Sequence, residues 1–260
     1  MITSLDNAQV KEARKLQRRR QRQRTGTCLV EGVRLVRDAR TSGAVVHRLF
    51  YAPPLIAANA SALALIAACE ADHVPLLACS VEVFQSLTET VTPQGVAAII
   101  AIPQLPLPQS LQFVLILDQL RDPGNAGTLL RTAEAAGIGL AIFGPETVDA
   151  FNDKVVRAGM GAHFRLPLRT CATWDEIHAL LGPTPRYYVA EAHATMLYTD
   201  VDWMVPCALI VGGEAAGASA AVAKFAQPVA IPMPSQVESL NAAVAGAVIL
   251  FEAARQRRMK

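Results

Sequence analysis

The 260-residue chain has few cysteines, few aromatic residues and little net charge. Its five cysteines are scattered and none falls in a C-x-x-C pair, which argues against a disulfide framework and against a zinc site. We interpret them as reduced, mostly buried thiols of a cytoplasmic protein. Aromatic residues make up only 5% of the chain, so an exposed aromatic surface for stacking nucleic-acid bases is not expected.

Long apolar runs and the common cofactor motifs are also missing. No apolar stretch reaches the roughly 18 residues of a membrane-spanning helix, and the first residues lead into charge, so we expect neither a transmembrane helix nor a signal peptide. The histidines are isolated, which indicates neither a metal site nor a Ser-His-Asp triad, and His163 is expected to be structural. No lysine follows a glycine run as in a P-loop, and Gly137 to Gly144 lacks the third glycine of the dinucleotide-binding motif. A nucleotide-dependent oxidoreductase is therefore disfavoured.

The cationic residues are concentrated near the N-terminus. The formal net charge is only +2, but Lys11 to Arg24 contains eight cationic residues and one acid, Glu12. We predict a basic helix over Asn7 to Arg22. Such a patch suits a polyanion or an acidic membrane surface, whereas the alternative is a solvated helix face without a partner. A smaller basic group closes the chain at Arg255, Arg257, Arg258 and Lys260.

The Pro-rich stretch Ile102 to Pro108 is the best candidate for a domain boundary, because prolines spaced this way continue neither a helix nor a central strand. We therefore divide the chain into a domain over 1–103, a linker over 104–109 and a domain over 110–260. The first domain reads as a small α/β domain. Its strands are predicted over Leu29–Val30, Val45–Tyr51 and Val96–Ile100, and its helices after the basic one over Val33–Ala39 and Ala62–Ala71.

The second domain alternates more clearly between strand and helix. Phe113 to Leu117 is a continuous apolar run, as expected of a strand covered on both faces. A loop over Asp118 to Gly127 leads into a helix that ends near Gly137. Further strands are predicted over Leu140–Phe143, Tyr187–Ala190, Ala208–Val211 and Val229–Ile231. This pattern predicts a mostly parallel sheet, whose ligands bind beyond the carboxyl ends of the strands.

Three segments that follow predicted strands carry candidate functional residues. In the first, Asp118 to Arg131, we expect Pro123 to Gly127 to form a tight turn before a helix. The free backbone N–H groups of such a turn could hold an anion or a polar ligand edge. Arg131 is expected about one turn into the helix, on the same side as the loop. The alternative is an ordinary turn with a solvated arginine.

The second and third segments lie closer to the C-terminus. Val211 to Gly217 has paired glycines that would let the backbone approach a flat ligand, and one acid, Glu214; the alternative is a tight connection that needs glycine for its geometry. Ile231 to Asn241 precedes a helix that Ser239 or a nearby polar residue can cap, and a capped C-terminal helix is the simpler interpretation. The predicted apolar stripe of this helix is Val244, Val248 and Phe251, and the small residues Ala243, Gly246 and Ala247 would permit close packing.

Taken in order, the three segments resemble the three motifs of the SpoU-type branch of the SPOUT RNA methyltransferases. The match covers most of 110–260, and Lys154 to Ala162 is similar to the intermediate stretch of the family. The N-terminal segment, with Glu31 and Gly32 after a basic helix, looks like the substrate-binding domain often fused to it. The matching residues are Asn125, Gly127 and Arg131 in the first motif, Gly212, Gly213, Glu214 and Gly217 in the second, and Ile231, Pro232, Met233, Glu238, Ser239, Leu240 and Asn241 in the third.

The resemblance implies a C-terminal trefoil knot, a homodimer, and S-adenosylmethionine as the cofactor, without a metal. It implies methyl transfer to a ribose 2′-hydroxyl of ribosomal or transfer RNA, and the alternative is a catalytically silent RNA-binding protein of the same fold. The catalytic residues carried over are Arg131, Asn125, Glu214, Ser239 and Asn241. The cofactor-binding residues carried over are Gly212, Gly213, Gly217, Ile231, Met233 and Leu240, which would act chiefly through backbone groups.

The chemistry limits what these residues have to do. The sulfonium methyl is already activated, so the protein must align the ribose oxygen and help to remove its proton. In the family Arg131 is the proposed proton acceptor, but a guanidinium with a pKa above about 12 is better suited to bind the adjacent phosphate and to lower the pKa of the hydroxyl. The residues expected to hold the RNA backbone are Lys11, Arg14, Lys15, Arg18, Arg19 and Arg22.

Overall fold

The computed structural model describes residues 1–183, 185–214, 217–234 and 238–258. Contacts within the chain divide it into two units. The first contains Met1–Pro103 and also the short segment Phe151–Arg157, and the second contains Gln104–Ala150 and Ala158–Lys260. Each unit has its own sheet and its own hydrophobic core. In the described part of the chain, no helix is long and apolar enough to span a membrane.

The first unit is built on a mixed four-stranded sheet in the order β1-β4-β2-β3. The central strand β4 pairs antiparallel with β1 and β2, and β2 pairs parallel with β3. The strands are β1 (Thr27–Glu31), β2 (Val46–Tyr51), β3 (Leu76–Ala78) and β4 (Val96–Ala101). The helices are α1 (Ala8–Lys15), α2 (Arg19–Thr25), α3 (Val33–Thr41), α4 (Pro53–Ile56), α5 (Ala60–Ala71) and α6 (Val81–Gln85). The small α/β domain is confirmed, although the three-residue β3 is too short to show a period and was not predicted.

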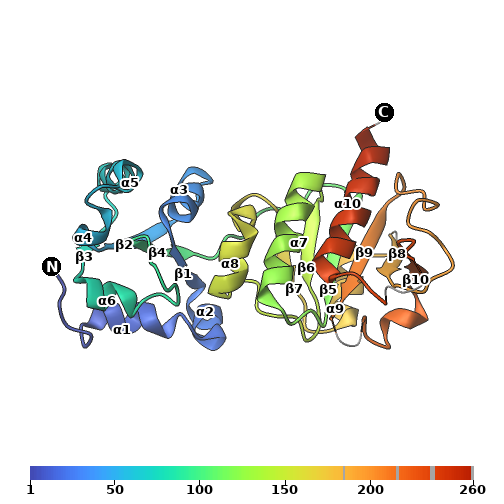
Figure 1. Cartoon of the computed structure of the whole chain (residues 1–260), viewed down its shortest axis with the longest axis horizontal. Helices are drawn as coiled ribbons and strands as arrows, with labels where there is room; N and C mark the ends of the chain where they lie inside the picture. Colours follow the sequence, from blue (N-terminus) through green and yellow to red (C-terminus); the bar gives the residue numbers. More distant parts are fainter. Residues whose placement is uncertain (184, 215–216, 235–237, 259–260) are drawn as a thin grey trace. The chain divides into compact units, whose positions relative to one another are not determined.

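The predicted basic helix over Asn7 to Arg22 is wrong in its extent, because two helices occupy this region (Figure 1). The helix α1 begins after Asn7, whose side chain accepts the N–H of Gln9, and it ends at Lys15. The guanidinium of Arg22 in α2 folds back and donates to the carbonyls of Leu16 and Gln17 at 2.7 and 2.9 Å. These carbonyls follow the last residue of α1, so the arginine satisfies them where the helix no longer can.

The second unit contains an all-parallel six-stranded sheet in the order β10-β8-β9-β5-β6-β7. This confirms the mostly parallel sheet. The strands are β5 (Phe113–Asp118), β6 (Leu140–Phe143), β7 (Leu168–Thr170), β8 (Arg186–Ala190), β9 (Cys207–Gly212) and β10 (Gln227–Val229). The α-helices of this unit are α7 (Pro123–Ala136), α9 (Trp174–Leu181) and α10 (Ala242–Arg258), with 3-10 turns η1 (Ala162–Phe164) and η2 (Val222–Lys224). The helix α8 (Asp153–Gly159) belongs to the first unit up to Arg157 and ends in the second.

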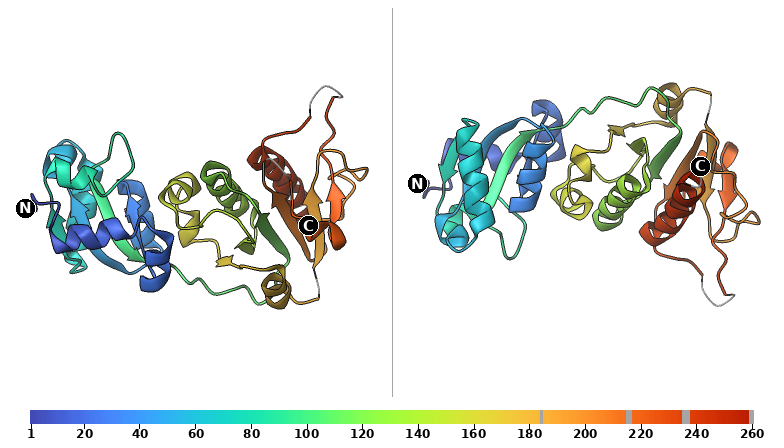
Figure 2. Two further views of the ribbon diagram at one scale, coloured as in Figure 1. Left: turned by 90° about the horizontal axis from the view of Figure 1, so that it is seen from below. Right: turned by 90° about the horizontal axis from the view of Figure 1, so that it is seen from above.

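Both faces of this sheet are covered, which explains the continuous apolar run of β5. On one face, Ile116 and Ile210 share a core with Ile177 of α9 and Val222 of η2. The helices α7 and α10 lie side by side over the sheet (Figures 1 and 2). A Cβ added at Gly246 of α10 would lie 2.4 Å from Leu129 Cδ2 and 3.2 Å from Val211 Cγ2. The predicted close packing of the small residues of this helix is therefore confirmed.

The predicted apolar stripe of α10 does not face the core. Val244 and Phe251 are 49% and 47% exposed, and Val248 is only partly buried. The residues that α10 buries are instead Ala243, Gly246, Ile249, Leu250, Ala253 and Ala254. Small side chains let the helix approach α7 closely, while Val244 and Phe251 remain on the outer face.

Candidate active site

Side chains from three distant segments form one hydrogen-bonded chain. The amide Nδ2 of Asn125 donates to Glu214 Oε1 at 2.7 Å. The amide Nδ2 of Asn241 donates to Asn125 Oδ1 at 3.0 Å. Asn125 therefore uses both ends of its amide and links the segments that follow β5, β9 and β10. The structure brings the three predicted motifs together at one place, as their positions after parallel strands led us to expect.

Asn125 is held by the start of α7. The predicted turn over Pro123 to Gly127 is wrong, because these residues form the first turns of the helix itself. Asp122 is the N-cap and its side chain accepts the N–H of Asn125 at 2.7 Å, while Pro123 occupies a position where its missing N–H costs nothing. The carboxylate of Asp122 thus takes the position at this helix N-terminus where an external anion was expected.

Asn241 lies directly before α10 and caps it. Its Oδ1 accepts the N–H groups of Ala243 and Val244 at 2.9 and 3.2 Å, so Asn241 caps the helix while its Nδ2 bonds to Asn125. The polar cap expected near Ser239 is therefore Asn241. The capped-helix interpretation is correct, and the same side chain also belongs to the hydrogen-bonded chain.

The glycines after β9 let the backbone fold back on itself. A Cβ at Gly212 would lie 2.2 Å from the backbone nitrogen of Ala218 and 2.3 Å from the carbonyl carbon of Gly217. Gly213 and Gly217 exchange two backbone hydrogen bonds of 2.9 and 3.1 Å. The tight-connection alternative therefore holds here, because the nearest neighbour of Gly212 is the backbone of its own loop. Ala215 and Ala216 of this motif lie outside the described residues.

A cavity of about 840 Å³ lies beside this loop. That volume is within the usual range for sites that bind small molecules. The predicted residues that line the cavity are Gly212, Gly213, Glu214, Gly217, Ile231, Met233, Ser239, Leu240 and Asn241. Of the third motif, Ser235, Gln236 and Val237 lie outside the described residues. The cavity is thus lined by all six predicted cofactor-binding residues and by three of the five predicted catalytic ones.

Arg131 is not among the residues that line the cavity. The helix begins at Pro123, so Arg131 lies more than two turns into α7 and not about one turn, as predicted. Its side chain is exposed. Within one chain, the structure therefore places Arg131 outside the lining of the cavity.

Three polar residues of the cavity wall were not predicted. Glu191 and His193 follow β8, and Ser219 follows the glycine loop. Their place after parallel strands was the only signal in the sequence that could have found them. The Ser219 N–H donates to the fully buried Asp118 at 2.7 Å, while its buried Oγ has no hydrogen-bond partner among the described residues. A buried hydroxyl without a partner next to a cavity marks a place where a polar ligand atom could complete its hydrogen bonding.

His163 and the cysteines are buried. His163 is buried beside Ala150, with 2.8 Å from its Nε2 to the Ala150 carbonyl oxygen, and burial lowers its pKa to about 4. This fits the structural role expected for it. All five cysteines are free and buried, as we interpreted them, and burial raises the pKa of Cys207 to about 11. Among the described residues, no group of three or more His, Cys, Asp or Glu side chains is placed to hold a metal ion.

The N-terminal cationic residues differ in their surroundings. Arg14, Lys15, Arg18 and Arg19 are exposed, and Lys11 pairs with Asp6 at 2.8 Å. Arg22 is only 5% exposed and is bonded to two carbonyls, so its predicted place among the RNA contacts is corrected to a structural one. Of the C-terminal basic group, Lys260 lies outside the described residues.

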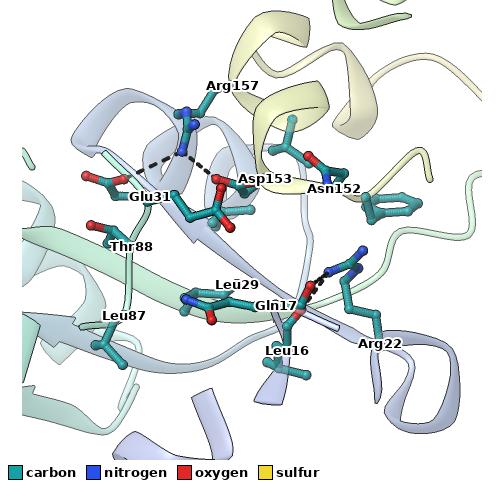
Figure 3. Close-up of a pocket in the computed structure, with 14 residues that line it drawn as sticks. Leu16, Gln17, Arg22, Leu29, Glu31, Leu87, Thr88, Asn152, Asp153 and Arg157 are labelled. Carbon is teal, nitrogen blue, oxygen red and sulfur yellow. Dashed lines mark hydrogen bonds and ion pairs between the residues drawn. The ribbon is translucent and has the colours of Figure 1, made fainter. Parts of the chain in front are cut away.

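The side chain of Glu31 is an internal anchor of the first unit. Its carboxylate accepts a hydrogen bond from the Thr90 hydroxyl at 2.5 Å. It also lies 4.0 Å from Arg157, which pairs with Asp153 at 2.7 Å (Figure 3). Glu31, Asp153 and Arg157 border a cavity of about 50 Å³, which is too small for a nucleotide. The Glu31–Gly32 signal in the sequence therefore marks a packed ion pair.

Comparisons with known proteins agree with this arrangement. Residues 112–251 match the SpoU rRNA methylase family, and residues 7–98 match the MRM3-like substrate binding domain. The 23S rRNA (guanosine(2553)-2′-O)-methyltransferase RlmP of Bacillus subtilis is 33% identical over 251 residues, which cover 96% of this chain and 97% of the relative.

Solved structures extend the similarity to the whole fold. The AdoMet-bound rRNA methyltransferase from Sinorhizobium meliloti is 32% identical with a TM-score of 0.83, covering 98% of this chain and 97% of that one. The SpoU methyltransferase AviRb from Streptomyces viridochromogenes, in complex with AdoMet, is 28% identical with a TM-score of 0.83, covering 98% and 100%. The family match spans more than half of the chain and includes all three motifs around the cavity, so the chain belongs to the SpoU rRNA methylase family.

Proposed function

We infer that this chain transfers the methyl group of S-adenosylmethionine to a ribose 2′-hydroxyl of ribosomal RNA. The Bacillus subtilis relative is named for 2′-O-methylation of 23S rRNA, and two similar structures hold AdoMet. The observation that carries the proposal is the hydrogen-bonded chain Asn241–Asn125–Glu214 at the cavity lined by the second and third motifs.

The cavity fits the cofactor in size and in the character of its wall. Its predicted binding residues are small or apolar, so their contacts to an adenosine would come chiefly from backbone groups, and Ser219 adds an unpaired hydroxyl. When bound there, S-adenosylmethionine supplies a methyl group already activated by the positive sulfur. Gly212, Ile231 and Leu240 are the residues that we expect to hold it, together with Gly213, Gly217 and Met233.

The protein contributes orientation and charge. Asn125 is fixed at both ends of its amide, which fixes the carboxylate of Glu214 and the amide of Asn241 relative to each other. Glu214 and Asn241 are exposed, so an RNA strand can reach them. We expect these groups, with Ser239, to align the ribose hydroxyl with the methyl group, because alignment alone supplies several kcal/mol in reactions of this type.

Arg131 acts in this function as part of a homodimer. The outer face of α10 carries the half-exposed Val244 and Phe251, an apolar surface that a second copy would bury. Arg131 is exposed on the neighbouring helix α7 and does not line the cavity of its own chain. In the dimer it serves the cavity of the partner subunit, where it binds the phosphate next to the target ribose and lowers the pKa of the hydroxyl.

The exposed N-terminal cations contact the RNA backbone. These are Lys11, Arg14, Lys15, Arg18 and Arg19, on the part of the chain that matches a substrate binding domain. Binding of this kind weakens steeply as salt rises. The similar rRNA methyltransferases come from a bacterium or carry a mitochondrial name. We place this chain in the cytoplasm, where ribosomal RNA and the cofactor are both present.

The activity is tested by tritiated methyl transfer from S-adenosylmethionine to unmodified bacterial ribosomal RNA and transfer RNA, followed by nuclease digestion. We expect label on a ribose of ribosomal RNA, and no label with Glu214→Gln. Label on a base, or no label from folded protein that binds the cofactor, would contradict the activity; the second result would favour a silent RNA-binding protein. Calorimetric titration with the cofactor shows whether a protein that transfers no label still binds S-adenosylmethionine.

The dimer is tested by mixing two inactive variants. We expect Arg131→Ala to keep its affinity for the cofactor and to lose turnover, and Glu214→Gln to lose turnover as well. A mixed dimer then contains one cavity with both residues intact, so co-refolded variants regain activity. If the mixture stays inactive while light scattering shows dimers, Arg131 does not act across the interface.

A further inference from the structure

The cavity wall carries an acid that belongs to none of the three motifs. Glu191 follows directly after β8, and its backbone N–H donates to the carbonyl of Val229 at the end of β10. Glu214 follows the neighbouring strand β9. Because β8 and β9 run parallel, both acids lie beyond the carboxyl edge of the sheet, and both line the cavity.

Besides these two acids, the only titratable side chain among the described lining residues is His193. No lysine or arginine is among the described residues that line the cavity, and the undescribed segments 215–216 and 235–237 contain no charged residue. Neither Glu191 nor Glu214 has a cationic partner in the described part of the chain, although Glu214 accepts the neutral amide of Asn125. The wall therefore carries two formal negative charges and no fixed positive one.

The two forms of the cofactor differ in charge. S-adenosylmethionine has one net positive charge at neutral pH, because its sulfonium and ammonium groups outnumber its carboxylate. S-adenosylhomocysteine, which remains after the methyl group has left, has a neutral thioether and no net charge. The exposed carboxylate of Glu191 on the cavity wall distinguishes them by its charge, with the modest strength of an interaction that solvent partly screens.

We propose that Glu191 is a specificity-determining residue that favours the cationic methyl donor over its neutral product. This inference rests on the proposed function, since it concerns the cofactor of that site. Its consequence for the reaction is that the methyl donor binds in preference to the product, and the product leaves after each turnover. The competing role, a hydrogen bond from a ribose hydroxyl of the adenosine to Glu191, would serve both forms equally.

The test is calorimetric titration of the full-length protein with S-adenosylmethionine, S-adenosylhomocysteine and sinefungin, in which a carbon bearing an amine replaces the methylsulfonium. The variants are Glu191→Gln, Glu191→Lys and the matched control Glu70→Gln, which removes an exposed acid of α5 in the first unit. We expect Glu191→Gln to weaken the binding of both cationic ligands about fivefold and that of the neutral product less than about twofold. Glu191→Lys should weaken the two cationic ligands further relative to the neutral product. Added salt should reduce this difference between wild type and variant, and Glu70→Gln should leave all three affinities unchanged.

Equal weakening of all three ligands would assign Glu191 to the ribose and overturn the inference, and so would unchanged affinities. Both results leave the proposed function intact, because the wild-type protein still binds the methyl donor. Failure of the wild type to bind any of the three ligands would overturn the proposed function and this inference with it.

Discussion

Two glycines near the cavity allow a matched test of the packing described above. Gly212→Ala and Gly246→Ala each add one methyl group, but the neighbours of that methyl group differ. At Gly246 the nearest atom is the end of the Leu129 side chain, at 2.4 Å. At Gly212 the nearest atoms are backbone, the nitrogen of Ala218 at 2.2 Å and the carbonyl carbon of Gly217 at 2.3 Å.

At Gly246 two effects oppose each other. Overpacking a buried site costs about 1–3 kcal/mol. Replacing glycine by alanine within a helix recovers about 0.5–1 kcal/mol. Overpacking wins because Leu129 is fully buried and has little room to move, so we expect a net destabilisation of about 1 kcal/mol. In a domain of this size that lowers the melting temperature by about 2–4 °C, with little change in cofactor affinity.

At Gly212 no side chain can move aside, so the loop itself has to shift. The shift breaks the two hydrogen bonds between Gly213 and Gly217, which contribute about 1 kcal/mol each. The larger effect is on the cavity, because Gly213, Glu214 and Gly217 line it and move with the loop. We expect Gly212→Ala to lose measurable cofactor binding while it still unfolds cooperatively.

Urea unfolding and calorimetric titration with S-adenosylmethionine measure both effects on the same samples. A Gly212→Ala protein that binds the cofactor as tightly as the wild type would contradict the expected shift of the loop. Loss of binding in Gly246→Ala but not in Gly212→Ala would contradict it as well, because the added methyl group meets backbone atoms at Gly212 and a side chain at Gly246.

Three further predictions concern other parts of the chain. The pKa of His163 is about 4 in the folded protein against an ordinary value of 6.5, so the unfolded chain binds the proton first and stability is lost as pH falls from about 6.5 to about 4. A difference of about 2.5 pKa units at about 1.4 kcal/mol each gives a loss of at most about 3.5 kcal/mol, and in His163→Gln the free energy of urea unfolding should vary less across this pH window. Arg22→Ala should lower the free energy of unfolding by about 2–3 kcal/mol, because the two hydrogen bonds to carbonyls are lost. Arg19→Ala should change it by less than about 0.5 kcal/mol and should reduce the salt dependence of RNA binding by about one phosphate contact. Equal losses of stability in the two variants would contradict the structural role of Arg22. Asn125→Ala should keep cofactor affinity and lower turnover at least about tenfold, since Glu214 and Asn241 lose the amide that joins them, and a steady-state assay showing raised KM with unchanged kcat would speak against this role.

Several features of the fold were predictable from patterns along the sequence. The apolar run over Phe113 to Leu117 predicted a strand covered on both faces, and burial of all of β5 confirms it. The alternation of strand and helix predicted the parallel sheet, because parallel strands need long crossover connections. Three short motifs after strands predicted a single site for the same reason, since parallel strands end at one edge. The trefoil knot is implied by membership of the family, as no periodicity in the sequence signals a threaded connection.

The sequence did not determine which polar atoms form hydrogen bonds or which helix faces are buried. Arg22 stands among seven other cations between Lys11 and Arg24, and only the end of α1 decides that it is the buried one. Pro123 to Gly127 contains the residues of a turn, and only the Asp122 cap makes it the start of a helix. The stripe of Val244 and Phe251 has the spacing of a core face, yet the small residues of α10 pack against α7 in its place. Charge and periodicity are properties of neighbouring residues, whereas pairing and burial depend on atoms that folding brings together from distant parts of the chain.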